Sequence, residues 1–341
     1  MRVMLDDYQN ATSEHCGSGS MRDLLQHYCQ LSLPESVVFG LGAGLDTLYF
    51  DEPNQRPAIM LLGRGVTMEQ DLATTLGIDY REQVELSDEL AWQQVRQEII
   101  EGRPTMLAGD IYYLDYRKFK VHFPGHRFVL VGFDDEKQCV YIGDRTDVEA
   151  QACSLAAVKL SRNSPVGMSS HNLWGKFNSG AVSNSLEEAC ERSLRITAQR
   201  MVGDDRSQLD LLGGMRGSGG GFLASGLAGL TLFQQHIAGW DDRDNDASLA
   251  AYLVNTIVNF GTGGGLFRNL FAQYLVWAGD LRPDLIKAKD IDLAQSSADS
   301  WNLIATLASK GQHVDWDSVD RQLEAVLQAE TQLFEQLAVR L

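Results

Sequence analysis

The sequence has few basic residues and no dense basic segment. Its 341 residues include 29 Lys and Arg against 46 Asp and Glu, so the formal net charge is −17. The densest cationic group is Arg117, Lys118 and Lys120, which amounts to a single turn of chain. A nucleic acid needs an extended basic surface to neutralise its phosphates, so this balance argues against nucleic acid as a partner. We expect the small cationic group to be a solvated loop.

Long hydrophobic runs are also missing. No stretch approaches the roughly 18 consecutive apolar residues that a membrane-spanning helix needs. The first residues carry an acidic pair, Asp6 and Asp7, in place of a basic and then apolar leader. We therefore expect a soluble, cytoplasmic protein with no membrane partner. The composition is otherwise that of a globular chain, and the length suggests two domains.

Cysteine is scarce and scattered. The chain has five cysteines, an odd number, and no two of them form a CxxC pair. This spacing argues against a disulfide scaffold and against a zinc site, and nothing else in the sequence indicates a metal or another cofactor. Most of these thiols are expected to be buried as small hydrophobic side chains. The cysteines are Cys16, Cys29, Cys139, Cys153 and Cys190.

The pattern of apolar residues divides the chain into two halves with different expected secondary structure. Up to about residue 150, helical and extended patterns alternate, which predicts a domain of mixed α and β structure. The clearest extended signal is a hairpin, in which apolar segments at 128–133 and 139–142 flank the polar turn 134–137. The other expected elements are helices over residues 20–31, 67–76 and 87–100 and strands over residues 57–62 and 79–84.

Beyond about residue 183 the periodicity is almost entirely helical. Strand signals are nearly absent there, so the sequence predicts an α+β chain that ends in an all-helical domain. We place the first domain at residues 1–160, a Ser-, Asn- and Gly-rich linker or functional loop at 161–183, and the helical domain at 184–341. The acidic excess is concentrated early, because residues 1–150 carry 13 basic and 25 acidic residues. The expected helices cover residues 186–202, 222–237, 248–260, 266–277, 298–309 and 319–337.

Cys16 stands just before the first expected helix. At a helix N-terminus, unpaired N–H groups and the positive end of the helix dipole stabilise a thiolate, and the same groups can stabilise an oxyanion. Ser20 and Asp23 have capping-box spacing, which would begin the helix a few residues after Cys16. Cys16 is then either a nucleophile or a buried structural cysteine beside a cap. The adjacent His15 is expected to point elsewhere and is not paired with it.

The hairpin supplies a base for Cys16. His126 opens its first strand and Asp144 follows its second, and antiparallel pairing brings the start of one strand beside the end of the next. The two side chains then become neighbours, as a catalytic base and its orienting carboxylate must be. His122 and Asp147 are the competing base and acid, but they flank the apolar runs less directly. Cysteine on a helix, with histidine and acid on adjoining strands, is the papain-like arrangement for thiol catalysis.

Three glycine-rich segments also occur. Residues 40–44 resemble a dinucleotide-binding fingerprint, but the third glycine comes too early, so we expect a tight turn near the active site. Residues 261–265 enter a helix with Arg268, either as an anion-binding nest or as a flexible turn with a structural arginine. The third segment is 213–221. Four further histidines receive no catalytic role, namely His27, His171, His236 and His313.

Several longer motifs in this order resemble a known family. The first half resembles the N-terminal domain of the butirosin-biosynthesis protein H family, and the helical half resembles the domain of unknown function that commonly follows it. The resemblance runs from about His15 to Leu337. The motifs that carry it are HCGSGSMRDLL, SVVFGLGAGL, GRPTMLAGDIYYLDY, PGHRFVLVGFD, VYIGD and GTGGGLFRNLFAQYL.

This resemblance implies a papain-like fold and a reaction. An acyl group would pass from a thioester, expected to be carried by an acyl carrier protein, to an amine, with an acyl-enzyme as intermediate. Cys16 matches the family's nucleophile, His126 its base and Asp144 its acid. In the type member the acceptor is an aminoglycoside. We expect an amide-forming enzyme of specialised metabolism.

Charge and aromatic residues bear on its partners. A negative protein attracts a cationic amine such as a polyamine or an aminoglycoside, whereas it repels an acidic carrier protein unless a local basic patch offsets the field. Tyr112 and Tyr113, with Tyr116 nearby, are expected to cover the acyl-enzyme, and Tyr112, Tyr113 and Arg268 are the predicted substrate-binding residues. The apolar faces of the long helices could also form a homodimer.

Two other functions compete with acyl transfer. On the same triad, water in place of the amine would make the protein a thioesterase or an amide hydrolase. A protein that kept the fold without the chemistry would be a binding or scaffold protein. That last reading predicts that Cys16 is an unreactive thiol.

Overall fold

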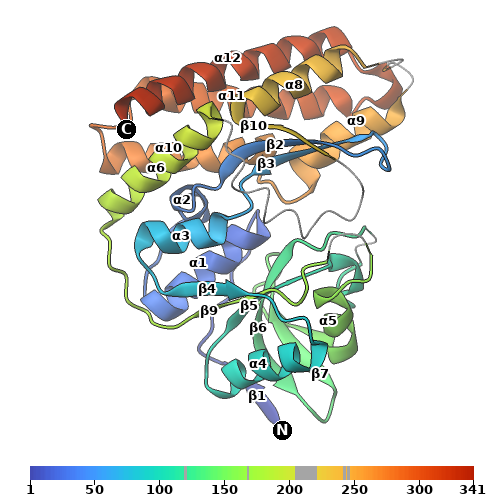
Figure 1. Ribbon diagram of the computed structural model, residues 1–341, viewed down its shortest axis with the longest axis vertical. Helices are drawn as coiled ribbons and strands as arrows, with labels where there is room; N and C mark the ends of the chain where they lie inside the picture. The colour runs from blue at the N-terminus through green and yellow to red at the C-terminus, as the bar shows by residue number, and fades with distance from the viewer. Residues whose placement is uncertain (119–120, 167–168, 204–220, 241–242, 244–245) are drawn as a thin grey trace. The chain divides into compact units, whose positions relative to one another are not determined.

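The computed structural model describes residues 1–118, 121–166, 169–203, 221–240, 243 and 246–341 (Figure 1). Among these residues, unit 1 comprises 1–38 and 77–183, and unit 2 comprises 39–76 and 184–341. The division differs from the predicted domains in two places. Residues 39–76 belong to the C-terminal unit, and the expected linker contributes a strand to the sheet of unit 1. Local patterns do not show either fact, because both depend on pairing between distant strands.

Unit 1 is built on a seven-stranded antiparallel sheet. Its order is β4-β9-β5-β6-β7-β8, and β1 pairs with β6 outside this path. The predicted hairpin is confirmed, since β6 and β7 pair from Val129 opposite Gly143 to Asp134 opposite Cys139. The strands are β1 (Arg2–Met4), β4 (Tyr80–Gln83), β5 (Thr105–Gly109), β6 (His126–Asp134), β7 (Cys139–Gly143), β8 (Gln151–Ser154) and β9 (Trp174–Phe177).

Three helices accompany this sheet. Helix α4 begins after Ser87, whose hydroxyl accepts the N–H of Leu90, and its acidic first turn suits the positive end of the dipole. Val95 and Ile99 from α4 form a core cluster with Phe128 of β6. That cluster fixes the strand from which His126 projects. The helices are α1 (Cys16–Cys29), α4 (Asp88–Ile100) and α5 (Leu155–Arg162), with a 3-10 turn η1 (Ile111–Tyr113).

Unit 2 is mainly helical, as predicted, but it also contains a three-stranded sheet of order β10-β2-β3. The start of the expected helix 222–237 is strand β10, which pairs with β2, and the helix itself begins at Gly226. The strands are β2 (Leu45–Asp51), β3 (Ile59–Arg64) and β10 (Gly221–Ser225). The α-helices are α3 (Met68–Leu76), α6 (Leu186–Val202), α8 (Gly226–Ala238), α9 (Ala247–Val254), α10 (Arg268–Leu281), α11 (Ala288–Ala308) and α12 (Trp316–Arg340).

The glycines at 40–44 serve packing and a turn within this part of the chain. Helix α2 (Glu35–Leu41) contains the boundary between the units, and a turn joins it to β2. Gly40 lies against the ring of Tyr274, where a Cβ atom would stand 1.9 Å from the ring carbon Cγ. The glycine is therefore required by the close approach of Tyr274. Both residues belong to unit 2, whereas the candidate site described below lies in unit 1.

Arg268, at the start of α10, is buried in unit 2 with 2% of its surface exposed. Its Nε and Nη2 donate to the two carboxylate oxygens of Glu330 at 2.8 and 2.9 Å. Nη2 also donates to Thr47 Oγ1 at 2.8 Å, and Nη1 donates to the carbonyl of Leu266 at 3.0 Å. A guanidinium that is buried and paired in this way is a structural group. These contacts argue against the predicted role of Arg268 in substrate binding.

The predicted anion nest before α10 has its donors occupied by the chain itself. The N–H of Gly265 donates to Asn302 Oδ1 at 2.8 Å, and the N–H of Gly264 donates to Thr262 Oγ1 at 3.2 Å. Both glycines have positive φ angles of 56° and 81°. Of the two interpretations left open by the sequence, the contacts favour a structural arginine after a glycine turn. The segment 213–221 lies outside the described residues except for Gly221.

Removing one partner of this buried ion pair is expected to destabilise unit 2. Glu330→Ala leaves the Arg268 guanidinium buried without a counter-charge, which costs about 3–5 kcal/mol of the free energy of unfolding. Urea unfolding followed by circular dichroism measures the change. Asp284→Ala is the matched control, because this carboxylate pairs with Arg282 at the surface and its loss should barely move the unfolding midpoint. Equal shifts in the two variants would contradict the structural role of Glu330.

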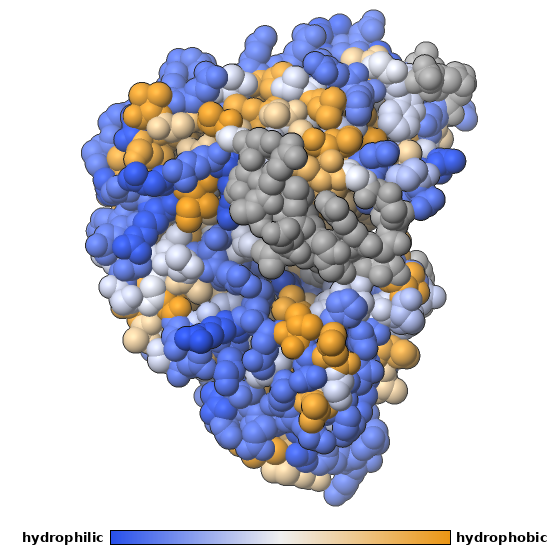
Figure 2. Space-filling view, viewed as in Figure 1, coloured by the Kyte–Doolittle hydropathy of each residue, from blue (hydrophilic) through white to orange (hydrophobic). Residues whose placement is uncertain are grey.

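The surface agrees with the acidic composition. On the face shown in Figure 2, hydrophilic residues cover most of the described surface, and hydrophobic residues are scattered among them. Among the described residues, no helix combines the length and the apolar character needed to span a bilayer. Exposed apolar side chains such as Leu86 and Leu90 do occur in unit 1.

Candidate active site

Cys16 is the first residue of α1, and it is buried with 8% of its surface exposed. The helix begins here because His15 caps it, with Nδ1 accepting the N–H of Ser18 at 3.2 Å. The predicted start after Cys16, with a capping box at Ser20 and Asp23, is therefore wrong. Asp23 instead accepts the N–H of Ala11 at 3.0 Å. The thiol thus lies in the first turn of the helix, where the backbone N–H groups point outward from the end.

His126 and Asp144 lie side by side, as their places in the hairpin predicted. His126 is the first residue of β6, and Asp144 directly follows β7. His126 Nε2 lies 3.0 Å from Asp144 Oδ2, and both side chains are almost fully buried. With Nε2 engaged by the carboxylate, Nδ1 is the ring nitrogen left for a hydrogen bond with Cys16. Cys16, His126 and Asp144 all belong to unit 1.

Cys16, His126 and Asp144 change one another's pKa values. Burial opposes ionisation of Cys16, but the charge of His15 and hydrogen bonds to His126 and His15 hold the pKa of the thiol well below its ordinary value. Burial also opposes protonation of His126, yet Asp144 and Cys16 together raise the pKa of His126 to about 9. The pKa of Asp144 is lowered despite burial, chiefly by the charge of His126. Both shifts favour a thiolate beside an imidazolium.

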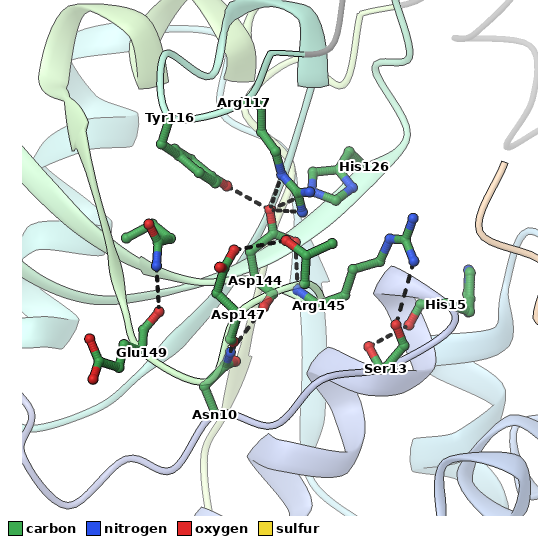
Figure 3. A network of polar contacts seen from close by, with 12 residues as sticks. Asn10, Ser13, His15, Tyr116, Arg117, His126, Asp144, Arg145, Asp147 and Glu149 are labelled. Atoms are coloured by element: carbon green, nitrogen blue, oxygen red, sulfur yellow. Dashed lines mark hydrogen bonds and ion pairs between the residues drawn. The ribbon is translucent and has the colours of Figure 1, made fainter. Parts of the chain in front are cut away.

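Asp144 has three further partners that the sequence did not reveal. Tyr116 donates its hydroxyl to Asp144 Oδ2 at 2.6 Å, and Arg117 donates Nε to the same oxygen at 3.0 Å (Figure 3). The N–H of Arg145 donates to Oδ1 at 2.7 Å. The carboxylate is therefore fixed in place and kept ionised by several donors. The sequence around Tyr116 and Arg117 did not predict that these residues bind Asp144, because the partners are 28 and 27 residues apart in the chain.

A second set of contacts ties the loop before Cys16 to the residues around Asp144. Asn10 Nδ2 donates to the carbonyl of Asp144 at 2.9 Å and also to the carbonyl of Asp147 (Figure 3). The N–H of Ser13 donates to the carbonyl of Arg145 at 2.9 Å. Arg145 Nη1 donates to the carbonyl of Glu14 at 2.9 Å. These bonds hold the approach to the thiol against the loop that carries the acid.

The competing base has its own carboxylate. His122 Nδ1 lies 2.7 Å from Asp110 Oδ2, and its ring stacks on Tyr112 with centroids 4.1 Å apart. Tyr113 also lies against His122, at 5.7 Å between centroids. Tyr112 and Tyr113 thus surround His122, and their predicted substrate contacts stay a prediction. Of the two candidate bases, His126 is the one that contributes to lowering the pKa of Cys16.

Arg117, the first residue of the predicted cationic group, is already paired within the protein. Arg117 forms an ion pair with Asp144, and only 15% of its side chain is exposed. Lys118 is exposed, and Lys120 lies outside the described residues. Among the described residues, no group of three or more His, Cys, Asp or Glu side chains is placed to hold a metal ion.

The pH dependence of alkylation is expected to separate Cys16 from an ordinary thiol. Iodoacetamide reacts with the thiolate, so the rate at an unperturbed cysteine rises with pH through about 8.5. With its pKa held far lower, Cys16 should reach its plateau rate at or below neutral pH, and the paired state should persist until His126 loses its proton near pH 9. Peptide mapping by mass spectrometry measures the rate at each cysteine.

Cys29, the last residue of α1, is the internal control for this measurement. Burial raises the pKa of Cys29, so its alkylation should keep rising through the alkaline range. If the profile of Cys16 followed that of Cys29, the thiolate–imidazolium pair would be refuted.

The fold and the site together define an α+β protein with a cysteine at the start of a helix and, in the same unit, an imidazole hydrogen-bonded to a carboxylate. Two family models match the chain. Residues 15–145 match the model described as butirosin biosynthesis protein H, N-terminal, and residues 154–337 match a domain of unknown function (DUF4872). The chain belongs to the family that these two models define, which confirms the predicted resemblance and points to a biosynthetic enzyme. A search of curated proteins found no match.

Proposed function

We propose that this protein is a cysteine-dependent N-acyltransferase that moves an acyl group from a thioester through acyl-Cys16 to an amine. The observation that carries the proposal is the buried series of Cys16, His126 and Asp144, with its thiolate and imidazolium. A helix-borne thiol beside a strand-borne imidazole also supports a papain-like fold for unit 1. The family name, which refers to butirosin biosynthesis, supports a role in specialised metabolism.

The first half-reaction loads the enzyme. The thiolate of Cys16 attacks the thioester carbonyl carbon, a sulfur–carbon bond forms, and the carbonyl electrons move onto oxygen. When this intermediate collapses, the bond to the donor thiol breaks, and His126 gives its proton to the departing sulfur. Asp144 stabilises the imidazolium before that transfer and orients the ring throughout. The products are acyl-Cys16, a free thiol and a neutral imidazole.

The second half-reaction makes the amide. The amine nitrogen attacks the acyl-enzyme carbonyl, and His126 removes the proton that the nitrogen must lose. The carbon–sulfur bond then breaks, and Cys16 leaves as a thiolate. The imidazolium beside it is restored, so the enzyme returns to its starting state. Water in place of the amine would give hydrolysis by the same steps.

The charge of the chain favours a cationic acceptor. Residues 1–150, which contain Cys16, His126 and Asp144, carry 13 basic and 25 acidic residues. Such a field attracts a polyamine or an aminoglycoside and repels an acidic carrier protein. Because Arg117 already pairs with Asp144, it offers little compensation to an acidic donor. The donor in this proposal is a thioester, with the acyl carrier protein as its expected carrier.

The test follows both half-reactions. The protein is incubated with a panel of N-acetylcysteamine thioesters, and peptide mapping looks for the mass of an acyl group on Cys16. Spermidine or an aminoglycoside is then added, and the products are analysed for amide and free acid. Acylation at Cys16 followed by amide formation supports the proposal. Free acid alone, with every amine tested, would make the protein a hydrolase, and an unreactive Cys16 would exclude both.

A further inference from the structure

Residues 10–15, which we call the connecting segment, lead directly into Cys16 and are bound on two sides. On one side the partner is α1 itself. Arg22 Nη2 donates to the carbonyl of Ala11 at 2.8 Å, and Asp23 Oδ2 accepts the N–H of the same residue at 3.0 Å. Both side chains belong to α1, so the connecting segment is fixed to the helix that begins at the thiol.

Glu35 fixes the end of the connecting segment that is nearest to Cys16. Its Oε2 accepts the N–H of Glu14 at 2.9 Å, and its Oε1 accepts the N–H of His15 at 2.8 Å. Two N–H groups just before the helix are satisfied in this way. A group that holds Glu14 therefore also holds the start of α1.

On the other side, Asn10 binds the connecting segment to the loop after β7 (Figure 3). Its Nδ2 donates to the carbonyl of Asp144 at 2.9 Å and also to the carbonyl of Asp147. Gly143, the last residue of β7, leaves room for this amide, because a Cβ atom there would stand 2.8 Å from Asn10 Oδ1. Asn10 therefore lies directly against the end of the strand that Asp144 follows.

Arg145 makes the second link to this loop. Its N–H donates to Asp144 Oδ1 at 2.7 Å, and its Nη1 donates to the carbonyl of Glu14 at 2.9 Å. Among the described residues, no carboxylate pairs with its guanidinium, which binds the carbonyls of Ser13 and Glu14. A cation beside the N-terminal end of a helix opposes the helix dipole, so the stability of α1 does not account for this arginine. Its contacts join the carboxylate of Asp144 to the residues just before the thiol.

We propose that Arg145 and Asn10 are positioning residues, which hold the thiol in register with the imidazole and carboxylate of the candidate site. This inference rests on the proposed function, because it names residues that place the nucleophile of that reaction. Cys16 is on α1, whereas His126 and Asp144 lie at the paired ends of β6 and β7. Sharing a proton between sulfur and nitrogen depends on distance and angle, and the two side chains hold these parts of unit 1 together.

Two substitutions remove these links, and a third restores one of them. Arg145→Met removes the side-chain donors, while the backbone N–H that reaches Asp144 stays. Asn10→Ala removes a neutral amide and so changes no charge. In Arg145→Lys, the ammonium group can still donate to the carbonyl of Glu14. Arg81→Met is the matched control, because the side chain of Arg81 is 77% exposed and pairs with a surface carboxylate of the same unit.

The experiment measures the ratio of the alkylation rate of Cys16 by iodoacetamide at pH 7 to its rate at pH 9. An ordinary thiol is about 3% ionised at pH 7 and about 75% at pH 9, so complete loss of the imidazolium partner would lower this ratio about 25-fold. We expect a fall of about tenfold in Arg145→Met and about threefold in Asn10→Ala, the scale of one charged and one neutral hydrogen bond. Arg145→Lys and Arg81→Met should keep the wild-type ratio.

Cys29 reports on the fold in the same samples. It lies at the other end of α1, and burial raises the pKa of its thiol, so its rate should keep rising through the alkaline range in every folded variant. Unfolding would move Cys29 to the profile of an ordinary thiol. Asn10→Ala removes a single neutral group at a half-buried position, so its result decides the matter even if Arg145→Met does not fold.

Three outcomes would overturn the inference. The ratio could stay at its wild-type value in both Arg145→Met and Asn10→Ala. It could fall in Arg145→Met alone, in which case the charge of the arginine acts on the thiol and positioning does not. It could also fall as far in Arg145→Lys as in Arg145→Met. Because alkylation needs no acyl donor, a wild-type protein that makes no amide from any thioester would refute the proposed function while the ratio still reports on Arg145 and Asn10.

Discussion

Cys16→Ser is expected to lower the rate of acyl transfer by about 10⁴-fold or more, which is the scale seen when a covalent nucleophile is removed. Serine has nearly the same shape, so the first turn of α1 and the contacts around it should persist. Its hydroxyl, however, ionises far above the pKa of a thiol. The thiolate–imidazolium pair with His126 therefore cannot form. The initial rate of thiol release from an acyl thioester measures the loss.

Cys29→Ser is the matched control for this prediction. Cys29 is at the other end of the same helix, and burial raises the pKa of its thiol. Its replacement should leave the rate of thiol release unchanged. A Cys16→Ser variant that kept full activity would end the proposal that an acyl-Cys16 intermediate forms.

Asp144→Asn is expected to have the second largest effect, about 10³- to 10⁴-fold on the rate, as when the orienting acid of a triad is replaced by its amide. Asp144 and Cys16 raise the pKa of His126 to about 9 against the effect of burial. Without the carboxylate the imidazolium loses its main support, and the pKa of His126 falls. Cys16 then loses its charged neighbour, so its own pKa rises.

The expected rise in the pKa of Cys16 in Asp144→Asn can be measured by alkylation. In Asp144→Asn the alkylation profile of Cys16 should move to higher pH, and the rate at neutral pH should fall. Arg117 also loses its counter-charge, so the variant should unfold at a lower urea concentration. Denaturant unfolding must therefore show that the protein is folded under the assay conditions.

Asp147→Asn is the control for the choice of acid. The carboxylate of Asp147 accepts the hydroxyl of Thr146 at 2.8 Å, and its backbone carbonyl, which the substitution keeps, accepts Asn10. This variant should keep both its alkylation profile and its transfer rate. If Asp147→Asn lost activity and Asp144→Asn did not, the assignment of the acid would be wrong.

The sequence predicted the central residues of the site because they follow from local rules. A hairpin with a short polar turn forces the start of β6 beside the end of β7, and this places His126 and Asp144 together although 18 residues separate them. The position of Cys16 near the start of a helix could be predicted from the apolar periodicity of the residues that follow it, up to about residue 29. His15 was given no role from the sequence, whereas its ring caps α1 by accepting the N–H of Ser18.

The fold was predictable to a similar extent. The mixed first half and the helical second half follow from hydrophobic periodicity. The assignment of residues 39–76 to unit 2 does not, because β2, which pairs with β3 nearby, finds its other partner β10 more than 150 residues later in the chain. Arg268 was misjudged for the same reason, since Glu330 is 62 residues away.

By itself, the sequence determined the family, the class of fold and the three groups that could do the chemistry, since each depends on neighbours along the chain or on motifs within it. The tertiary structure decided what surrounds them. Asn10 reaches the carbonyl of Asp144 across 134 residues, and Arg117 reaches its carboxylate across 27. Such contacts fix charge and orientation, and they leave no periodic trace in a sequence because only folding brings the partners together.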